Sequence, residues 1–375
     1  MLALRLSMLL AAVLAAGVAR AETRASIPVL VPLTGFLALE GTSQRNGALM
    51  AFRAAPAGVA VDHEVIDTAT SPEAAVNAFA RALRQGPPTA VVAPMLGTQM
   101  LALLPLAAGA GVPLVTVSGT AEITERGNPW VFRFFPGDAV VKAAQARYVV
   151  EELGRRRVAL VHQTTAYGQS GRRHLVERFA ALGAEIVFEE GLAPAVRDMA
   201  PVLTKLRAAR PDVIVLQLHA EPTARFIRQA AALSVGLPVV AGSAMHQPAT
   251  AALLEPVELT GVCAESGSSP ISEERPEIRR WVADYRALFQ IEPDAFALAQ
   301  HDGVAMVLSA VATGAATPAA VRDALATGSH EGLAMTYRSD GAGNMAHDAV
   351  VICYDGRDRI PRIVKRYLDP AGSRS

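Results

Sequence analysis

Short apolar runs rich in β-branched residues alternate along this chain with longer segments whose apolar positions repeat at helical spacing. Such alternation predicts parallel strands joined by crossover helices, because parallel neighbours need a connection long enough to hold a helix. The expected strands are Ile27–Pro32, Val61–Asp67, Ala90–Ala93, Leu114–Val117, Val158–His162, Glu185–Glu190, Val213–Gln217 and Pro238–Ala241. The pattern therefore predicts an α/β fold built on parallel sheets.

Helical segments lie between these strands, and two of them carry clear start signals. Ser71 and Thr317 each stand before a proline, which gives an N-cap residue followed by proline at the first helical position. Helices are expected at Val140–Leu153, Gln169–Leu182, Thr223–Leu233, Glu277–Phe289, Ala295–Ala312 and Ala319–Ala326.

The series of strands breaks near residues 267–270, and three of the expected helices follow the break. A turn-rich segment at 339–344 then leads into two final strands, Ala349–Tyr354 and Arg362–Tyr367. The chain has 375 residues, more than one hydrophobic core usually organises, so two domains are expected. The order of elements indicates two lobes that exchange chain.

The N-terminal segment has the pattern of a secretory signal. Arg5 precedes an apolar run from Leu6 to Val18, and the run closes on Ala19-Arg20-Ala21. An A-x-A site of this kind predicts a signal peptide of residues 1–21, cleaved before Glu22. The run is too short to cross a hydrocarbon core of about 30 Å, and no cysteine follows it to take a lipid. We therefore expect a soluble, periplasmic mature protein.

The charge composition bears on possible partners, and the cysteine content bears on disulfide bonding. Lysine plus arginine equals aspartate plus glutamate at 35 each, so no overall field is expected to recruit nucleic acid or an anionic membrane. Only two cysteines occur, Cys263 and Cys353. They either form a disulfide, which the oxidising destination permits, or pack as two small apolar residues.

The chain carries no motif of a common enzyme class. Residues 168–171 lack the spacing of a serine nucleophile elbow, and no phosphate-binding P-loop occurs. Residues 341–346 fit G-x-G-x-x-A, but a strand pattern follows them instead of a helix, which argues against a dinucleotide site. The eight histidines show no zinc-ligand spacing. We expect no catalytic residue, no metal and no cofactor.

Two loops at neighbouring strand ends are candidates for a ligand site. Residues 95–99 follow the third strand and residues 117–121 follow the fourth, and each loop supplies glycine, hydroxyls and backbone donors at a helix start. Ligands of open α/β sheets lie beyond the carboxyl ends of the strands, so the two loops together favour a small carboxylate. The alternative is that Thr98, Ser118 and Thr120 only cap their helices.

The chain carries, in order, PVLVPLTGFLALEGTSQRNGALMAF from Pro28, VVAPMLGTQ, GVPLVTVSGTAEIT from Gly111, WVFRFFPGD, VALVHQTTAYGQSG from Val158, PDVIVLQ, FIRQAAALSVGLPVVAGS and YRSDGAGN. In this order the stretches, which cover nearly the whole mature chain, resemble the leucine/isoleucine/valine-binding family of type I periplasmic binding proteins. The resemblance implies two doubly wound parallel-sheet lobes joined by three crossovers, with the ligand trapped between them.

The crossovers implied by the resemblance lie near residues 136–138, 266–269 and 339–344. Lobe 1 would then comprise residues 22–137 and 268–340, and lobe 2 residues 138–267 and 341–375. The same resemblance assigns the carboxylate-binding positions to Gly97 or Thr98, to Ser118 and to Thr120. Because the family commonly has a hydroxyl where this chain has Gly97, Thr98 or the backbone must supply that contact. Tyr167 matches an aromatic residue of lobe 2 that covers the ligand, or is an ordinary tyrosine at a helix start.

Three positions depart from the family pattern. Glu40 stands where a lobe 1 aromatic packs on amino-acid ligands, and a lobe 2 aromatic position falls near His219. An acidic residue that holds the ligand ammonium is expected at 243–245, but no carboxylate lies between Val235 and Leu254. Either Glu40 or Glu221 replaces it, or the ligand is a small carboxylate or amide-like metabolite without an ammonium, which we favour. Exposed surface positions are the alternative for Glu40, His219 and Glu221.

The resemblance implies a binding protein that captures a small polar metabolite and delivers it to the permease and ATPase of an ABC-type importer. A monomer that closes around its ligand is expected, and an amino acid remains one candidate ligand. The alternative function is a periplasmic sensory component that signals to a membrane receptor or kinase. An exported enzyme on this scaffold is the third possibility, which the absence of a nucleophile, metal set or phosphate loop disfavours.

Overall fold

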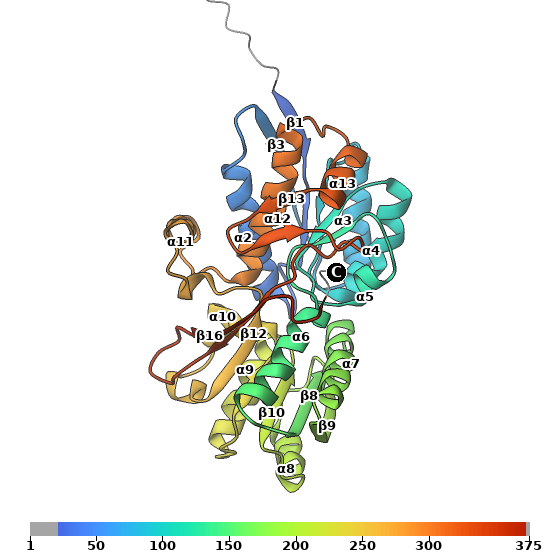
Figure 1. The fold of residues 1–375 in the computed structure, drawn as a ribbon. Helices are drawn as coiled ribbons and strands as arrows, with labels where there is room; N and C mark the ends of the chain where they lie inside the picture. Colours follow the sequence, from blue (N-terminus) through green and yellow to red (C-terminus); the bar gives the residue numbers. More distant parts are fainter. Residues whose placement is uncertain (1–21, 373–375) are drawn as a thin grey trace, which may run out of the picture.

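The computed structural model describes residues 22–372, which form two lobes stacked end to end (Figure 1). The predicted signal peptide lies outside the described residues, so its cleavage before Glu22 stays a prediction.

Lobe 1, at the top of Figure 1, contains a five-stranded parallel sheet. The strand order is β4 (Val65–Asp67), β2 (Val29–Val31), β5 (Val91–Val92), β6 (Leu114–Thr116) and β7 (Val131–Arg133). Its helices are α2 (Ala38–Arg53), α3 (Pro72–Arg84), α4 (Gly97–Ala110), α5 (Glu122–Glu125), α11 (Pro276–Phe289), α12 (Ala295–Ala312) and α13 (Pro318–Thr327). Two small sheets pair β1 (Thr23–Ser26) with β3 (Val59–Asp62) and β13 (Ser329–Glu331) with β14 (Thr336–Arg338).

Lobe 2 contains a seven-stranded sheet. The strand order is β16 (Arg362–Tyr367), β15 (Ala349–Cys353), β12 (Val262–Ser266), β11 (Val239–Ala241), β10 (Val213–Gln217), β8 (Arg157–Gln163) and β9 (Glu185–Leu192). Its helical segments are α6 (Asp138–Arg147), η1 (Tyr148–Glu152), α7 (Ala166–Ala181), α8 (Ala200–Ala208), α9 (Ala220–Ala232), η2 (Ser243–His246), α10 (Pro248–Ala251) and η3 (Pro256–Leu259). The short helix η4 (Pro270–Ser272) follows β12 and packs against α11 of lobe 1.

The chain crosses between the lobes after β7, after β12 and after β14. Each sheet is covered by helices, and the central strands β5, β6, β10 and β11 are buried along their whole length, as parallel strands require. The predicted fold of two α/β lobes joined by three crossovers is therefore confirmed.

The sheets differ from the prediction in three places. The expected strand at 61–67 is two strands, β3 and β4, which belong to different sheets. Strand β12 was not predicted, because its sequence VCAES lacks a β-branched run. Strand β15 pairs antiparallel with β12, and β16 pairs antiparallel with β15, so the sheet of lobe 2 is mixed.

Helix starts and the core follow the sequence closely. Ser71 Oγ accepts the N–H of Ala74 at 3.3 Å and Thr317 Oγ1 accepts that of Ala320 at 3.2 Å, which confirms both predicted N-caps. Helix α12 is, among the described residues, the one helix long and apolar enough to span a membrane. It is 78% buried inside lobe 1, where it packs against α2, so it is a core helix.

Cys263 and Cys353 are cross-strand neighbours in the antiparallel pair of β12 and β15. Their sulfurs form a disulfide, with an S–S distance of 2.04 Å. Of the two alternatives open from the sequence, the bridge is the one present. The disulfide links β15 to β12, and its two cysteines are 90 residues apart in the sequence.

Candidate ligand-binding site between the lobes

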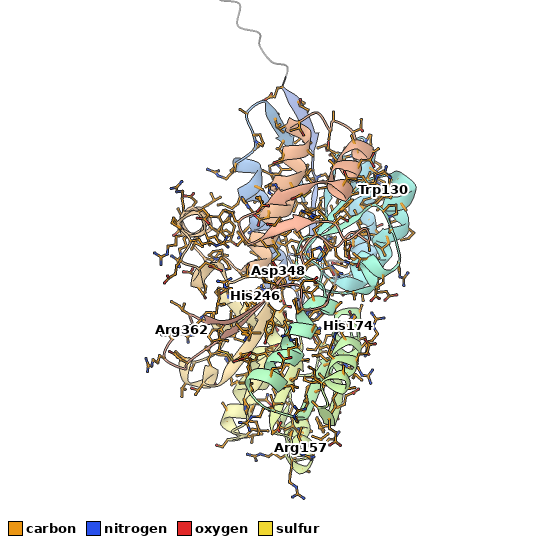
Figure 2. The ribbon with its side chains drawn as sticks, viewed as in Figure 1. Trp130, Arg157, His174, His246, Asp348 and Arg362 are labelled. Carbon is orange, nitrogen blue, oxygen red and sulfur yellow. A yellow bond between two sulfur atoms is a disulfide. The ribbon has the colours of Figure 1, made fainter. Side chains whose placement is uncertain are left out.

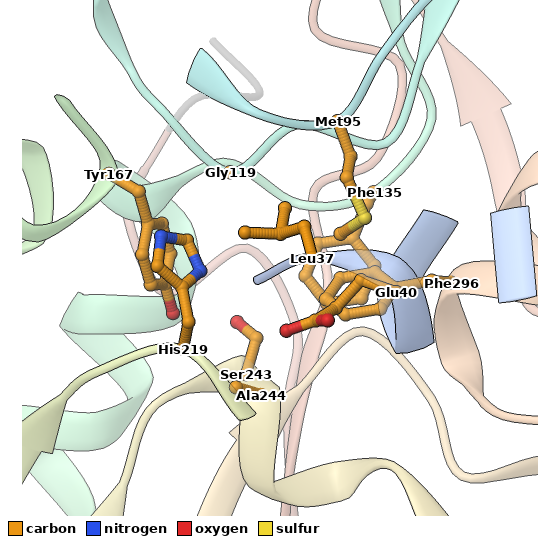
Figure 3. Close-up of a pocket in the computed structure, with 10 residues that line it drawn as sticks. All are labelled: Leu37, Glu40, Met95, Gly119, Phe135, Tyr167, His219, Ser243, Ala244 and Phe296. Carbon is orange, nitrogen blue, oxygen red and sulfur yellow. The ribbon is translucent and has the colours of Figure 1, made fainter. Parts of the chain in front are cut away.

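A pocket lies where the two lobes meet, and both lobes supply its wall (Figure 3). Lobe 1 contributes Leu37, Glu40, Met95, Gly119, Phe135 and Phe296, and lobe 2 contributes Tyr167, His219, Ser243 and Ala244. The enclosed space between these side chains is about 30 Å³, enough for one or two water molecules, so a ligand of several atoms requires the walls to separate. A ligand here would be enclosed from both sides.

The lobes also touch around the pocket, so the structure is in a closed arrangement. The polar contacts that join lobe 1 to lobe 2 include Ala220 N to Glu40 Oε1 (3.2 Å), Ala121 N to Ser170 Oγ (2.9 Å), Gln247 Nε2 to Asp294 Oδ2 (2.8 Å) and the ion pair of Arg173 with Glu125 (2.7 Å).

Residues 118–120, which we call the ligand loop, follow β6 and bring Gly119 to the pocket wall. The hydroxyls of Ser118 and Thr120 are buried and have no hydrogen-bond partner among the described residues. A buried hydroxyl without a partner is costly. Ser118 and Thr120 are not among the residues that line the pocket; they flank Gly119, which is. Gly97 lies against Thr120, because a Cβ at position 97 would be 2.1 Å from Thr120 Oγ1.

Arg133, the last residue of β7, lies beneath the ligand loop and was not expected from the sequence. Its guanidinium Nη1 donates to the carbonyls of Ser118 (3.4 Å), Gly119 (3.3 Å) and Thr120 (2.8 Å). The side chain is only 3% exposed, and burial lowers its pKa to about 10, so it remains charged at neutral pH. Arg133 forms no ion pair with the described residues, but the negative charges of Asp138, Asp340 and Glu125 act on it and oppose the effect of burial on its pKa.

An apolar wall occupies the lobe 1 side of the pocket. The rings of Phe135 and Phe296 lie 4.7 Å apart, and Leu37 and Met95 extend the same surface. His246, at the junction of the lobes in Figure 2, packs its ring 4.6 Å from Phe296 and 5.9 Å from Phe135. This wall suits the hydrocarbon body of a ligand.

Tyr167 and His219 form the facing aromatic surface from lobe 2. Their ring centroids are 5.0 Å apart and their planes are inclined by 31°. Burial lowers the pKa of His219 to about 3, so the imidazole is neutral. Both predicted residues therefore line the pocket, and His219 presents a flat uncharged ring where the family pattern has an aromatic residue.

Glu40 brings a carboxylate into the pocket from the first turn of α2. Its Oε1 accepts the backbone N–H of Ala220 at the start of α9, and its Oε2 has no partner among the described residues. The residue is 2% exposed, and burial raises its pKa to about 7, with Asp294 and Glu221 adding to that effect. Oε2 therefore makes no hydrogen bond with the described residues and can accept one from a further donor.

Behind Tyr167 lies a second polar cluster that the sequence did not indicate. Lys142 and Glu265 form a fully buried ion pair, and Ser243 Oγ donates to Glu265 at 2.8 Å. Asp138 begins α6, and its backbone N–H donates to the Gly119 carbonyl at 2.8 Å. Burial raises the pKa of Asp138 to about 6, against the opposing effect of Lys142.

The structure thus gathers most of the residues singled out from the sequence. Glu40, Tyr167 and His219 line the pocket beside the ligand loop, and Gly97 supports the loop from behind. Thr98 is half-buried and does not line the pocket. Glu221 is exposed, lies 3.9 Å from Arg225 and likewise stays out of the lining, so Glu40 is the acidic residue of the pocket. Among the described residues no group of acidic, histidine or cysteine side chains is arranged to hold a metal ion.

Comparison with known proteins places this geometry in a family. The family model described as periplasmic binding protein matches residues 25–357. The Leu/Ile/Val-binding protein BraC3 of Rhizobium johnstonii is 26% identical over 226 residues, 59% of this chain and 61% of its own. That alignment spans less than two thirds of the relative's length.

Two solved structures illustrate the fold and the range of bound ligands. The branched-chain amino acid transporter substrate-binding protein LivJ of Streptococcus pneumoniae, in complex with isoleucine, has a TM-score of 0.83 and 24% identity, with 91% of this chain and 99% of that chain covered. An ABC-transporter solute-binding protein of Rhodopseudomonas palustris, in complex with 3,4-dihydroxybenzoic acid, has a TM-score of 0.83 and 21% identity, with 92% and 98% covered. At these identities the likeness establishes the fold.

Proposed function

This chain belongs to the periplasmic binding protein family, and from that premise we propose that it captures a small carboxylate outside the cytoplasmic membrane for an ABC-type importer. The ligand has an apolar body and, at another point, a hydrogen-bond donor. The observation that carries the proposal is a set of buried polar atoms without a partner: Oε2 of Glu40 in the pocket wall, and the hydroxyls of Ser118 and Thr120 on either side of the wall residue Gly119.

The carboxylate of the ligand would bind at the ligand loop. Ser118 and Thr120 offer two buried hydroxyls there, and the guanidinium of Arg133 supplies a positive charge behind them. A hydroxyl donating to a carboxylate makes a charge-assisted hydrogen bond, which is stronger than one between neutral groups. The loop therefore favours an anionic oxygen group over a neutral one.

The donor of the ligand would face Glu40. An ammonium, as in an amino acid, would ion-pair with the carboxylate, whereas a ring hydroxyl, as in an aromatic acid, would donate to it. The surrounding walls accept either an aliphatic or an aromatic body, because Phe135 and Phe296 stand on one side and Tyr167 and His219 on the other. Both kinds of ligand occur in the two solved relatives, bound as isoleucine and as 3,4-dihydroxybenzoic acid.

Titration calorimetry with two matched pairs of compounds tests the proposal. L-Leucine is compared with 4-methylpentanoate, which lacks only the ammonium, and 4-hydroxybenzoate with benzoate, which lacks only the hydroxyl. We expect the donor-bearing member of at least one pair to bind about tenfold or more tightly than its partner. Absence of binding by all four compounds, or equal binding within each pair, would overturn the proposal. Mass spectrometry of small molecules released from denatured protein identifies the natural ligand.

Delivery would follow from closure of the lobes, which buries the ligand and creates a surface present only in the closed form. The permease and ATPase of the importer are the proposed partners, and the binding protein acts as a monomer. Reconstitution of a candidate permease and ATPase in vesicles, with and without the binding protein, measures that step.

A further inference from the structure

Arg133 contacts more than the ligand loop. On the side away from the three loop carbonyls, its Nε donates to Asn344 Oδ1 at 3.0 Å, and Nη2 donates to Asn344 and to Thr124 Oγ1. Asn344 belongs to residues 339–348, the connection that carries the chain from β14 of lobe 1 to β15 of lobe 2. One guanidinium therefore joins the ligand loop to an interlobe connection.

The backbone reinforces this junction. The N–H of Arg133 donates to the Gly343 carbonyl at 2.8 Å, and the N–H of Met345 donates to the Arg133 carbonyl at 2.9 Å. The connection at 339–348 thus runs beside the end of β7 as an extra strand for a short distance. Its position is set by Arg133 through both main chain and side chain.

The first interlobe connection packs on the same guanidinium. Gly137 lies between β7 and α6, and a Cβ at that position would be 2.4 Å from the guanidinium carbon and from Nη2 of Arg133. The glycine is needed because the backbone of the connection lies directly on the planar group. Two of the three interlobe connections therefore contact Arg133.

We propose that Arg133 is a positioning residue that couples the ligand loop to the hinge, so that seating a ligand on residues 118–120 shifts the interlobe connections towards their closed arrangement. This inference rests on the proposed function in one respect, namely that the ligand binds at the ligand loop. Arg133 itself lies behind the loop and is not among the residues lining the pocket.

Arginine suits this role for geometric reasons. Its planar group offers five N–H donors in a fixed fork, so hydrogen bonds on one edge constrain those on the other. Lysine would place one charge on one side and could not hold the loop carbonyls and Asn344 together. Because the guanidinium is 3% exposed, water cannot replace the contacts that a substitution removes.

A double-mutant cycle on ligand affinity tests the coupling. Thr120→Val removes a loop hydroxyl, and Asn344→Ala removes the hinge acceptor of Arg133. The control, Ser339→Ala, lies in the same connection and loses a hydrogen bond from Gly341, with no contact to Arg133. The probe is L-leucine or 4-hydroxybenzoate, whichever binds the wild-type protein more tightly.

We expect the effect of Thr120→Val and Asn344→Ala together to differ from the product of their separate effects by about fivefold or more, because contacting networks are not additive. The effects of Thr120→Val and Ser339→Ala should multiply within about twofold. Multiplication within twofold in both cycles would overturn the proposal, since a merely structural role of Asn344 predicts independence.

A ligand-free measurement separates this proposal from the proposed function. The described residues contain no free cysteine. Spin labels can therefore be placed at Arg84→Cys in lobe 1 and Arg197→Cys in lobe 2, both exposed positions. Arg133→Lys and Asn344→Ala should each change the distribution of distances between the labels, and Ser339→Ala should leave it unchanged. If no compound binds the wild-type protein, the proposed function fails, but the distances between the spin labels still test the coupling through Arg133. Unchanged distances in both Arg133→Lys and Asn344→Ala would refute that coupling.

Discussion

Replacing Glu40 with glutamine probes the donor end of the ligand with little change of shape. The glutamine oxygen can still accept the N–H of Ala220, which Glu40 Oε1 accepts at 3.2 Å. What disappears is the negative charge and the charged acceptor at Oε2, which faces the pocket without a partner. The change therefore removes the charge of Glu40 and keeps its hydrogen bond with Ala220.

The size of the effect depends on the donor. A charged hydrogen bond to an ammonium contributes about 1.5–3 kcal/mol, so affinity for L-leucine should fall roughly ten- to a hundredfold. A neutral hydroxyl contributes about 0.5–1.5 kcal/mol, so affinity for 4-hydroxybenzoate should fall roughly two- to tenfold. Compounds that lack the donor, 4-methylpentanoate and benzoate, should bind the variant at least as well as they bind the wild type.

The pH dependence gives a second signature. Burial raises the pKa of Glu40 to about 7, so below that pH the carboxyl must lose a proton before it can pair with an ammonium. Wild-type affinity for L-leucine should therefore rise between about pH 5.5 and pH 7 and level off above it, since an opposite charge favours the ionised form. The glutamine variant lacks this group, so the part of the rise that comes from Glu40 should disappear. Asp138, whose pKa burial raises to about 6, is a group at the cleft that still changes charge over this range.

Titration calorimetry at about pH 5.5 and pH 8.5, on either side of that pKa, measures both effects. Glu221→Gln is the matched control, because Glu221 is a nearby carboxylate that is exposed and does not line the pocket. Wild-type affinity of Glu40→Gln for both L-leucine and 4-hydroxybenzoate would refute the reasoning. An equal loss in Glu221→Gln would show that the effect is a general change of charge.

Three further outcomes are expected. Thr120→Val should weaken binding of a carboxylate about ten- to a hundredfold by calorimetry with a smaller change in thermal stability, and unchanged affinity would remove Thr120 from the site. Small-angle scattering should give a smaller radius of gyration with saturating ligand than without it, and an equal radius would exclude closure by the hinge. Intact-mass measurement of exported protein should place the N-terminus at Glu22, and a retained signal segment or an added lipid would contradict this.

The sequence indicated residues 118–120 as a ligand site, which stays a prediction, for a physical reason. Ser118 and Thr120 flank a glycine directly after a buried apolar strand, and such strand ends gather at one edge of a parallel sheet. The loop at residues 95–99 was indicated for the same reason, because it follows the neighbouring strand β5. Tyr167, at the corresponding end of β8, was found by the family resemblance, since a tyrosine near a helix start has no distinctive pattern of its own.

Arg133 shows what the sequence could not indicate. It lies in the aromatic-rich stretch WVFRFFPGD, whose charged residues are Arg133 and Asp138, and no pattern in the stretch assigns either of them a contact. Its contacts reach Asn344, 211 residues away, through a hydrogen bond that depends on how the crossover connections run. Likewise Glu40 and Glu221 were equivalent candidates until the fold turned one into the pocket and left the other in solvent.

The charge on Glu40 opposes closure of the ligand-free protein. Each hydrogen bond that crosses the cleft, such as those accepted by Glu40, Ser170 and Asp294, is worth about 0.5–1.5 kcal/mol net. The ion pair of Arg173 and Glu125 is about half exposed and adds at most about 1 kcal/mol. Against these stands the cost of burying the ionised Glu40, which is on the order of 3 kcal/mol for a pKa raised from 4.5 to about 7.

That balance predicts a pH-dependent shape for the ligand-free protein. A carboxyl whose pKa is higher in the closed form than in the open one favours closure at low pH, and this contribution is lost as the pH rises through about 7. The ligand-free radius of gyration should therefore increase between about pH 5.5 and pH 8.5 in the wild type and change less in Glu40→Gln. Equal radii for the two proteins at both pH values would show that Glu40 does not oppose closure.

A ligand that donates a hydrogen bond to Oε2 of Glu40 removes the same cost of burying the carboxylate. Glu40 then contributes both to affinity and to closure of the lobes. A complete shift from the open to the closed form needs roughly 5.5 kcal/mol, so the rest must come from the ligand loop and the apolar walls.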